Sequence, residues 1–184
     1  VTHDHADHCH GIDDLRPLAQ SLDSPMPVLG RALVLERLQS RFAYAFVQAG
    51  YYPPVEEPVE LGPELAFGNA RLTFADQPHG GITSLGIRID EGGRSLGYAI
   101  DFHDLTTAMA DLYRGVDVWI CDCLTERPHP SHAHLAAVLG WAEELGVGQV
   151  YLTHMGNGMD YRSLVEKLPG WAAPAHDGLE VTLQ

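Results

Sequence analysis

The sequence has few cysteines, few basic residues and no long apolar run. Three cysteines among 184 residues cannot build a disulfide framework. No stretch approaches the length of a membrane span, and no charged segment followed by a short apolar one marks a secretory signal. We therefore expect one soluble domain over residues 1–184 in the reducing cytoplasm, with 45% hydrophobic residues to fill its core.

Positive charge is the second shortage. The chain has 11 lysines and arginines against 25 aspartates and glutamates, which gives a formal net charge of -14. Without a basic patch the chain would repel a nucleic acid, so neither a nucleic acid nor a membrane is an expected partner. A small anionic substrate reached through bound cations remains compatible with this charge. The sequence does not decide the oligomeric state, and a homodimer is left open.

Metal-ligand side chains are concentrated at the start of the chain, in the run THDHADH over residues 2–8. Three imidazoles and two carboxylates within six residues are strong donors that only a metal ion would neutralise. In an extended segment His3, His5 and Asp7 point to one side. His8, at the first turn of a helix, would swing back over that side. The run therefore predicts ligands for two neighbouring ions.

A disordered histidine-rich tail or a tag remnant is the alternative interpretation of this run. Against it, Asp13 and Asp14 stand in the first turn of an expected helix, and apolar residues at helical spacing follow. A tail would also have no matching ligands downstream, whereas several are present.

The rest of the chain alternates between helical and strand-like patterns. Helices are expected at residues 12–22, 31–38, 104–113, 132–145 and 161–168, and strands at 28–29, 70–74, 82–89, 95–100, 116–123, 149–153 and 179–183. The proline-rich residues 51–58 predict a surface loop. Gly92-Gly93 predicts a hairpin turn, so the middle of the chain should be antiparallel. This order predicts an α/β fold with sheets covered by helices.

Four polar donors stand where an apolar strand stops or a turn begins. His79 precedes the strand 82–89, Asp101 follows 95–100 and His154 follows 149–153, while His132 begins an expected helix. Open sheets present functional groups at the ends of their strands. Each residue alone has an ordinary explanation, as a turn residue or a packed histidine. Together with the N-terminal run they supply the donors that two ions require.

Asp122 lies between Cys121 and Cys123 on an expected buried strand, so its side chain faces the opposite layer from theirs. A buried carboxylate needs a partner. Orienting His132 or a ligating histidine would supply one, and so would an ordinary structural hydrogen bond. The two cysteines are expected to be small core residues, because a CxC spacing without further cysteines is a weak metal signal.

Eight segments resemble a known family in their order along the chain. They are THDHADHCHGIDDLR, RFAYAF, QPHGGITSLGIRI, GYAIDF, VDVWICDCL, RPHPSHAHL, YLTHMG and AHDGLEV. These segments are similar to the metallo-beta-lactamase-fold hydrolases, and in particular to the branch of the phosphoribosyl 1,2-cyclic phosphate phosphodiesterase. The resemblance implies a single αββα hydrolase domain. Because that family begins with paired strands before the histidine-rich run, this chain is expected to be an N-terminally truncated copy.

The resemblance also implies seven ligands for two ions: His3, His5 and His79 on one, Asp7, His8 and His154 on the other, and Asp101 bridging them. Imidazoles and carboxylates suit Zn, Mn or Fe, so two divalent ions, Zn or Mn, are the expected cofactors. A hydroxide formed between such ions at neutral pH would be the nucleophile. No accessory zinc site is expected, because Asn157 stands where members of the branch have a further histidine.

His132 matches the position of a catalytic histidine in the resembled family. A group that titrates near pH 7 can protonate a departing alkoxide, so His132 is the expected proton donor, with Asp7 and Asp122 as further catalytic candidates. The ions and a helix N-terminus after His8 would neutralise the phosphate oxygens. His134, two residues along the expected helix, should point away. Four histidines receive no role: His10, His103, His129 and His176.

The expected function is hydrolysis of a small cyclic phosphate or a nucleotide-like phosphodiester. A tRNA 3'-processing nuclease shares the ligands, but the charge of -14 and the lack of a basic arm are against it. A lactone or thioester hydrolase would use the same hydroxide on a carbonyl. A non-catalytic metal- or nucleotide-binding protein is left open, because loosely held ligands lose activity before they lose binding.

Overall fold

The computed structural model describes residues 1–48 and 50–183, and the chain divides into two compact units, residues 1–62 and 63–184. Each unit has its own sheet and its own core. The single domain expected over residues 1–184 stays a prediction. None of the helices in the described part of the chain is long and apolar enough to cross a membrane.

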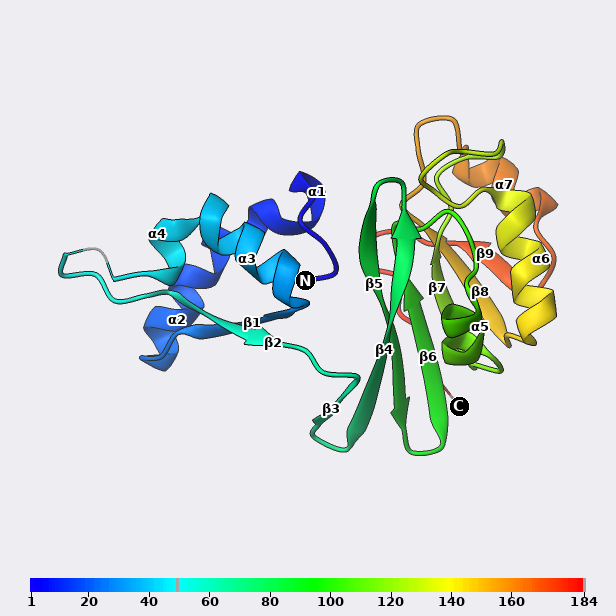
Figure 1. The fold of residues 1–184 in the computed structure, drawn as a ribbon. Coiled ribbons are helices and arrows are strands. Elements are labelled where there is room, and N and C mark those ends of the chain that lie inside the picture. The colour runs from blue at the N-terminus through cyan, green and yellow to red at the C-terminus, as the bar shows by residue number, and fades with distance from the viewer. Residues whose placement is uncertain (49, 184) are drawn as a thin grey trace. The chain divides into compact units, whose positions relative to one another are not determined.

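The first unit is mostly helical (Figure 1). Its elements are α1 (Ala6–Cys9), the 3₁₀ helix η1 (His10–Leu15), α2 (Arg16–Leu22), β1 (Met26–Gly30), α3 (Ala32–Arg41), α4 (Ala43–Phe46) and β2 (Glu56–Glu60). The two strands pair in parallel. Helix α3 buries Val34, Leu35 and Leu38, which share one face because Leu38 follows the other two by four and three residues. These residues pack with Ile12 and Val28 in the core of the unit.

Two expectations for this unit need correction. Of the helix expected over residues 12–22, only the part from Arg16 is an α-helix, and the residues before it belong to the tighter 3₁₀ helix η1. The loop expected over residues 51–58 is wrong from Glu56 onward, where β2 begins. Pro58 lies within β2, paired with Val28. A two-stranded sheet has only edge strands, and an edge strand tolerates a proline because one side of it needs no N–H donor.

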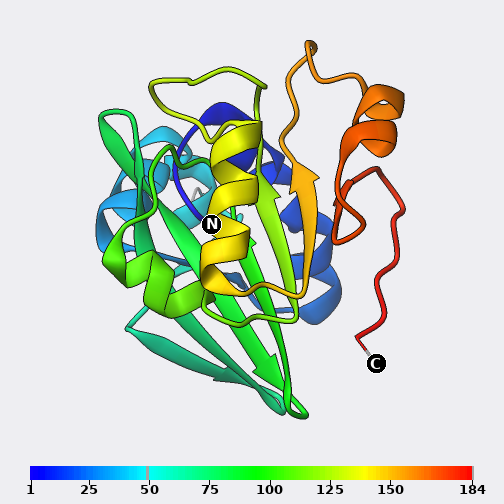
Figure 2. The same ribbon diagram turned by 90° about the vertical axis from the view of Figure 1, so that its right-hand side faces the viewer.

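The second unit is built on a seven-stranded sheet. Its strands, in spatial order, are β3 (Glu64–Phe67), β4 (Ala70–His79), β5 (Ile82–Glu91), β6 (Arg94–Ala99), β7 (Val118–Asp122), β8 (Gln149–Thr153) and β9 (Ala172–Pro174). Neighbours from β3 to β6 are antiparallel, and neighbours from β6 to β9 are parallel. Helices α5 (Thr107–Tyr113), α6 (Leu135–Leu145) and α7 (Tyr161–Lys167) connect the parallel strands, with α5 and α6 in front of the sheet in Figure 2.

The parallel strands are the apolar centre of this unit, as expected for strands covered by helices. Trp119, Cys121 and Leu152 are fully buried there, and Cys123 lies in the same core. The structural role expected for the two cysteines is confirmed by this burial. Burial raises the pKa of Cys123 to about 12, so its thiol stays protonated and unreactive at neutral pH.

Two element boundaries in this unit differ from the sequence prediction. The helix expected from residue 132 begins only at Leu135. The residues before it pair with the segment after β7 instead: His134 forms a parallel bridge with Thr125, and the N–H of Leu135 donates to the carbonyl oxygen of Thr125. His134 is therefore still extended at the N-cap. The last strand was expected at residues 179–183, but these residues, all within the described range, form none. The sheet instead ends with β9, which pairs with β8.

Glu56 is an unusual carboxyl in the first unit. Its side chain is 1% exposed, and among the described residues neither carboxylate oxygen has a hydrogen-bond partner. Burial raises its pKa from an ordinary 4.5 to about 7; Asp13 acts in the same direction and Arg16 opposes it. The folded protein therefore holds a proton that the unfolded chain releases at lower pH. The resulting stabilisation is complete below about pH 4.5 and is lost as the pH rises through about 7.

Replacing Glu56 with glutamine should remove this part of the pH dependence of stability. The free energy of unfolding of the wild type should fall between pH 5 and pH 8 by at most about 3 kcal/mol on account of Glu56, whereas E56Q should lack this fall. Urea unfolding at several pH values measures the difference. The control is E57Q, on the exposed neighbouring residue of the same strand. An equal pH dependence in E56Q and wild type would contradict the assignment.

Candidate metal centre

Polar side chains meet at one end of the seven-stranded sheet. His79 and Asp122 are the last residues of β4 and β7, Asp101 follows β6 closely, and His154 comes directly after β8. Strands β4 and β6 are both antiparallel to β5, and β7 and β8 are parallel to β6, so all four run in one direction. Their carboxyl ends lie at the same edge, where open sheets bind ligands. His132 joins them from the segment before α6.

Asp101 lies between two imidazoles. Its Oδ2 is 3.3 Å from Nε2 of His79, and its Oδ1 is 3.5 Å from Nε2 of His154. The Asp101 side chain is only 2% exposed. A carboxylate whose two oxygens face two different imidazoles has the geometry of a bridge between two metal ions, each with its own histidine.

The tautomer of His79 supports a metal ligand. Its Nδ1 is 2.7 Å from the carbonyl oxygen of Ser131. A carbonyl only accepts, so Nδ1 carries the proton and the Nε2 of a neutral ring presents a lone pair to Asp101. Two electron-rich atoms 3.3 Å apart require a proton or a metal cation between them. The donor set at this edge therefore fits divalent ions.

Asp122 connects three parts of this edge. Its carboxylate is fully buried, and Oδ2 accepts hydrogen bonds from Nδ1 of His132 at 3.0 Å and from the backbone N–H of Phe102 at 3.3 Å. Its Oδ1 is 3.6 Å from Nδ1 of His154. The Asp122 carboxylate thus bonds to His132 and lies next to His154. Of the two roles expected for Asp122, this geometry supports the orientation of a histidine rather than an ordinary structural hydrogen bond. Ligand atoms of Asp101, Asp122, His132 and His154 all lie within 4.8 Å of one another.

His132 presents Nε2 on the side away from Asp122. Because Nδ1 donates to the carboxylate, Nε2 is the atom that can exchange a proton with a substrate. The ring is stacked on His154, with centroids 5.1 Å apart and planes 15° apart, and it meets His79 edge-on at 4.7 Å. These contacts fix the ring beside two ligand candidates without using its Nε2.

Two residues of the site have strained backbones. Among the described non-glycine residues only Asp23, Asp101 and His154 have a positive φ, and the values for Asp101 and His154 are 53° and 54°. Left-handed backbone costs such a residue about 1 kcal/mol. Strain of this kind persists where the surroundings enforce it, and it gathers at functional sites.

The first unit gathers the histidines of the N-terminal run. The ring of His3 lies 4.6 Å from that of His5 and 4.4 Å from that of His8, centroid to centroid. The expected alternation ends at His5, because α1 begins at Ala6 and places Asp7 and His8 in its first turn. Nε2 of His8 is 3.3 Å from Oδ2 of Asp7. The helix N-terminus expected after His8 therefore lies before it, at Ala6.

Asp4 has a structural role that the sequence pattern does not reveal. Its two carboxylate oxygens accept hydrogen bonds from Arg37 and Arg41, each at 3.1 Å, and Arg41 also bonds to the Asp4 carbonyl oxygen at 2.6 Å. Burial opposes ionisation, but the hydrogen bond and charge of Arg37 outweigh it and lower the pKa of Asp4. The histidine run is therefore fastened to α3, which contradicts the interpretation as a loose tail. The spacing of four places the two arginines on one face of α3, but it does not point to Asp4.

The remaining histidines lie around the site or apart from it. His134 was expected on the helix, but it is the N-cap residue that precedes α6. His129 is exposed, with its ring 5.3 Å from that of His132, and Nδ1 of His103 accepts from the N–H of Gly80. His10 packs edge-on against Phe42 in the first unit. His176 is exposed near the C-terminal end.

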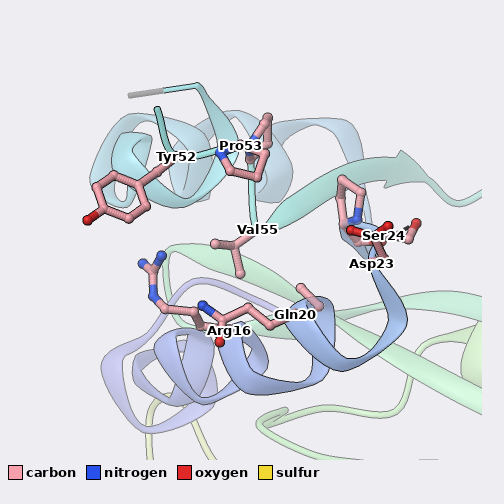
Figure 3. A pocket seen from close by; sticks show the side chains of 10 residues that line it. Arg16, Gln20, Asp23, Ser24, Tyr52, Pro53 and Val55 are labelled. Carbon is pink, nitrogen blue, oxygen red and sulfur yellow. Dashed lines mark hydrogen bonds between the residues drawn. The ribbon is translucent and has the colours of Figure 1, made fainter. Parts of the chain in front are cut away.

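A separate pocket of about 290 Å³ lies in the first unit (Figure 3). Arg16 and Gln20 of α2 line one side, and Tyr52, Pro53 and Val55 line the other. Its lining includes none of the predicted site residues. Its volume is at the lower limit for a small-molecule site, and its lining has one carboxylate, that of Asp23, and no histidine.

The comparison with known proteins decides the family. A model described as the beta-lactamase superfamily domain matches residues 1–155. The chain belongs to this superfamily. The matched range contains all seven predicted ligands, His132 and Asp122. The metallo-beta-lactamase resemblance and the α/β fold class predicted from the sequence are confirmed.

Solved structures agree with this assignment. A diphosphatase from the PhnP family matches with a TM-score of 0.85 and 28% identity, over 97% of this chain and 67% of that one. Zn(2+)-bound PqqB from Methylobacterium extorquens has a TM-score of 0.75 and 18% identity, over 99% of this chain and 71% of that one. Human tRNase Z, short form, has a TM-score of 0.73 and 16% identity, over 100% and 78%. The latter two similarities establish the fold alone.

A curated relative has a different activity in its name. An octanoyltransferase of Porphyromonas gingivalis (strain ATCC BAA-308 / W83) is 26% identical over 189 residues. The match covers 100% of this chain and 37% of the relative. The chain therefore spans little more than a third of that protein, and the activity in the name of the relative is that of the whole relative.

Proposed function

We propose that the protein is a dinuclear-metal phosphodiesterase that hydrolyses a small cyclic phosphate or a nucleotide-like diester. The observation that carries the proposal is that two arrangements occur at one edge of the sheet: Asp101 lies between two imidazoles, and the buried Asp122 orients His132. The first arrangement suits a two-ion centre, and the second suits proton transfer to a leaving group. The similarity to a diphosphatase supports chemistry on phosphate esters rather than on lactones or thioesters.

The proposed ligand set contains seven residues. The assignment follows the family resemblance: His3, His5 and His79 for one ion, Asp7, His8 and His154 for the other, and Asp101 for both. Three imidazoles gathered in the first unit and a carboxylate between two imidazoles in the second support it. Zn and Mn are the proposed ions. When bound, they would supply an activated water and neutralise phosphate oxygens.

The side chains of the second unit perform the proton transfer in this proposal. With Nδ1 donating to Asp122, a protonated His132 holds its second proton on Nε2 and delivers it to the departing alkoxide. The buried carboxylate stabilises the imidazolium before the transfer and keeps the ring in one orientation. His132 is therefore proposed as the catalytic acid and Asp122 as its positioning residue.

The direct test is turnover by the protein loaded with Mn or Zn. We expect hydrolysis of bis(p-nitrophenyl) phosphate and of phosphoribosyl cyclic phosphate, and loss of both activities in excess chelator. Absence of metal-dependent hydrolysis of either diester would contradict the proposal. If the protein binds two ions yet hydrolyses no diester, a metal-binding role without catalysis replaces it.

A tRNA 3'-processing nuclease is the competing function within the same fold. Human tRNase Z shares the fold, but the net charge of -14 opposes binding of a polyanion. We expect a precursor tRNA to be cleaved far more slowly than the cyclic phosphate. A faster cleavage of the tRNA, with a steep salt dependence, would favour the nuclease.

A further inference from the structure

A buried network of polar side chains lies behind Asp101 and has no part in the proposed chemistry. Gln77 on β4 and Ser84 on β5 are direct partners in the antiparallel register, and Tyr113 ends α5. All three are almost completely buried. Buried polar side chains are costly unless their hydrogen bonds are satisfied, so such a network restricts the conformation of whatever it holds.

The hydrogen bonds of this network form one chain of donors and acceptors that runs from Tyr113 to Asp101. The hydroxyl of Tyr113 lies 2.8 Å from Oε1 of Gln77 and 2.9 Å from the carbonyl oxygen of Tyr98. The shorter distance assigns its one proton to Gln77, which orients the amide. The Nε2 of Gln77 then donates to Oγ of Ser84 and to the carbonyl oxygen of Ile100, both at 3.0 Å. Oγ of Ser84 is 2.7 Å from the carbonyl oxygen of Asp101 and 2.9 Å from that of Ile100. A hydroxyl has one proton, and the shorter distance assigns it to Asp101.

Gly86 shows that the strand is shaped around this network. A Cβ atom at this position would lie 2.1 Å from the hydroxyl of Tyr113 and 2.6 Å from Oε1 of Gln77. No side chain fits there, so β5 brings its bare backbone against the two polar groups. The network is therefore specified by residues on three elements of the second unit.

The network ends at Asp101, one of the two strained residues of the site. Asp101 has a φ of 53°, and its carbonyl oxygen is held by Ser84. The next peptide N–H, that of Phe102, is held by Asp122. The peptide group after Asp101 is thus fixed from both sides, and with it the direction in which the Asp101 carboxylate leaves the backbone.

We propose that Ser84, supported by Gln77 and Tyr113, is a positioning residue that sets the metal affinity of Asp101. The inference rests on the proposed function only in taking Asp101 as a metal ligand. Groups that orient a ligand typically affect metal affinity by about 10- to 100-fold when they are removed. Ser84 touches neither substrate nor metal in this account, so its effect is transmitted through the Asp101 backbone.

The test compares S84A with S95A. Ser95 is a buried serine of the same sheet whose Oγ bonds to Asp117 at 2.9 Å, at the start of β6 rather than beyond its end. Chelator competition measures the affinity of each protein for Mn and for Zn, and thermal unfolding without metal measures the loss of stability. We expect S84A to lose about 10- to 100-fold in affinity. S95A should lose less than about two-fold although it unfolds at a similarly lowered temperature. Equal affinities in S84A and wild type would overturn the inference.

Two further variants secure the result. If S84A does not fold, Y113F removes the proton donated to Gln77 and keeps the ring, and its affinity should fall by a smaller factor of about 3- to 10-fold. An unchanged affinity in Y113F would then overturn the inference. S84T keeps the hydroxyl and should retain more affinity than S84A. Because binding is measured without substrate, a wild type that binds metal but cleaves no diester contradicts the proposed function alone, whereas a wild type that binds none contradicts both.

Discussion

Replacement of His132 by alanine is expected to lower kcat on a phosphodiester by about 10²- to 10⁴-fold, with little change in KM. His132 is placed to protonate the leaving oxygen, and proton donation to a poor leaving group is required only in the transition state. Metal content should be unchanged, because Nδ1 of His132 bonds to Asp122 and the proposed ligand set does not include this ring. Steady-state kinetics with parallel metal analysis measures the effect.

The leaving group provides the sharpest control. A p-nitrophenolate departs without protonation, so the loss in H132A should be much smaller on bis(p-nitrophenyl) phosphate than on a cyclic phosphate that releases an alkoxide. H129A is the matched variant, because His129 is an exposed histidine whose ring lies 5.3 Å from that of His132. It should keep wild-type activity on both substrates. Equal losses of H132A on the two substrates would assign His132 to another task.

Asp122 should support His132 in the same reaction. In D122N the carboxylate that accepts from Nδ1 becomes an amide, so the imidazolium loses its stabilising charge. We expect a kcat loss of about 10- to 100-fold on the cyclic phosphate and a much smaller loss on bis(p-nitrophenyl) phosphate, because a p-nitrophenolate needs no proton from His132. Steady-state kinetics of D122N and wild type on both substrates measures it. A purely structural role for Asp122 would lower stability and reduce the turnover of both substrates equally.

The strand-end residues could be predicted because their positions follow from local sequence. Apolar runs place Asp101 and His154 after strands, and the carboxyl ends of strands that run in one direction meet at one edge. His79 was expected in the turn before the strand 82–89, but β4 extends to it, five residues beyond the expected end at residue 74. Which of two partners Asp122 would take could not be predicted. That depends on how far the segment before α6 stays extended, and the bridge between Thr125 and His134, which joins residues nine apart, delays the helix start from residue 132 to Leu135.

Contacts between distant segments were outside the reach of the sequence pattern. Asp4 belongs to Arg37 and Arg41, more than thirty residues away, and nothing near Asp4 indicates this pairing. Ser84 reaches the carbonyl of Asp101 only because the β4–β5 register and the turn after β6 place it there. Conversely, local apolar alternation predicted a strand at residues 179–183, where the described structure offers no neighbouring strand to pair with.

Replacement of Asp101 by asparagine should have the second large effect, loss of the metal centre itself. The two oxygens of this carboxylate face His79 and His154, and an amide retains only one oxygen and no charge. We expect the number of bound ions to fall and affinity for the remaining ion to drop by more than about 100-fold, with activity lost in proportion. Elemental analysis after dialysis against a weak chelator measures both quantities.

Thermal unfolding separates this loss of metal from a general loss of stability. An ion that binds only the folded state stabilises the wild type by about 2.7 kcal/mol when its free concentration is a hundred times the Kd. D101N should show little of this metal-dependent gain, whereas D104N, at an exposed aspartate three residues further on, should show all of it. Without metal, D101N should be no less stable than the wild type, because the amide removes a buried charge and the left-handed backbone also tolerates asparagine. A full metal-dependent gain in D101N would mean that Asp101 is not a ligand, and it would remove the observation on which the proposed chemistry depends.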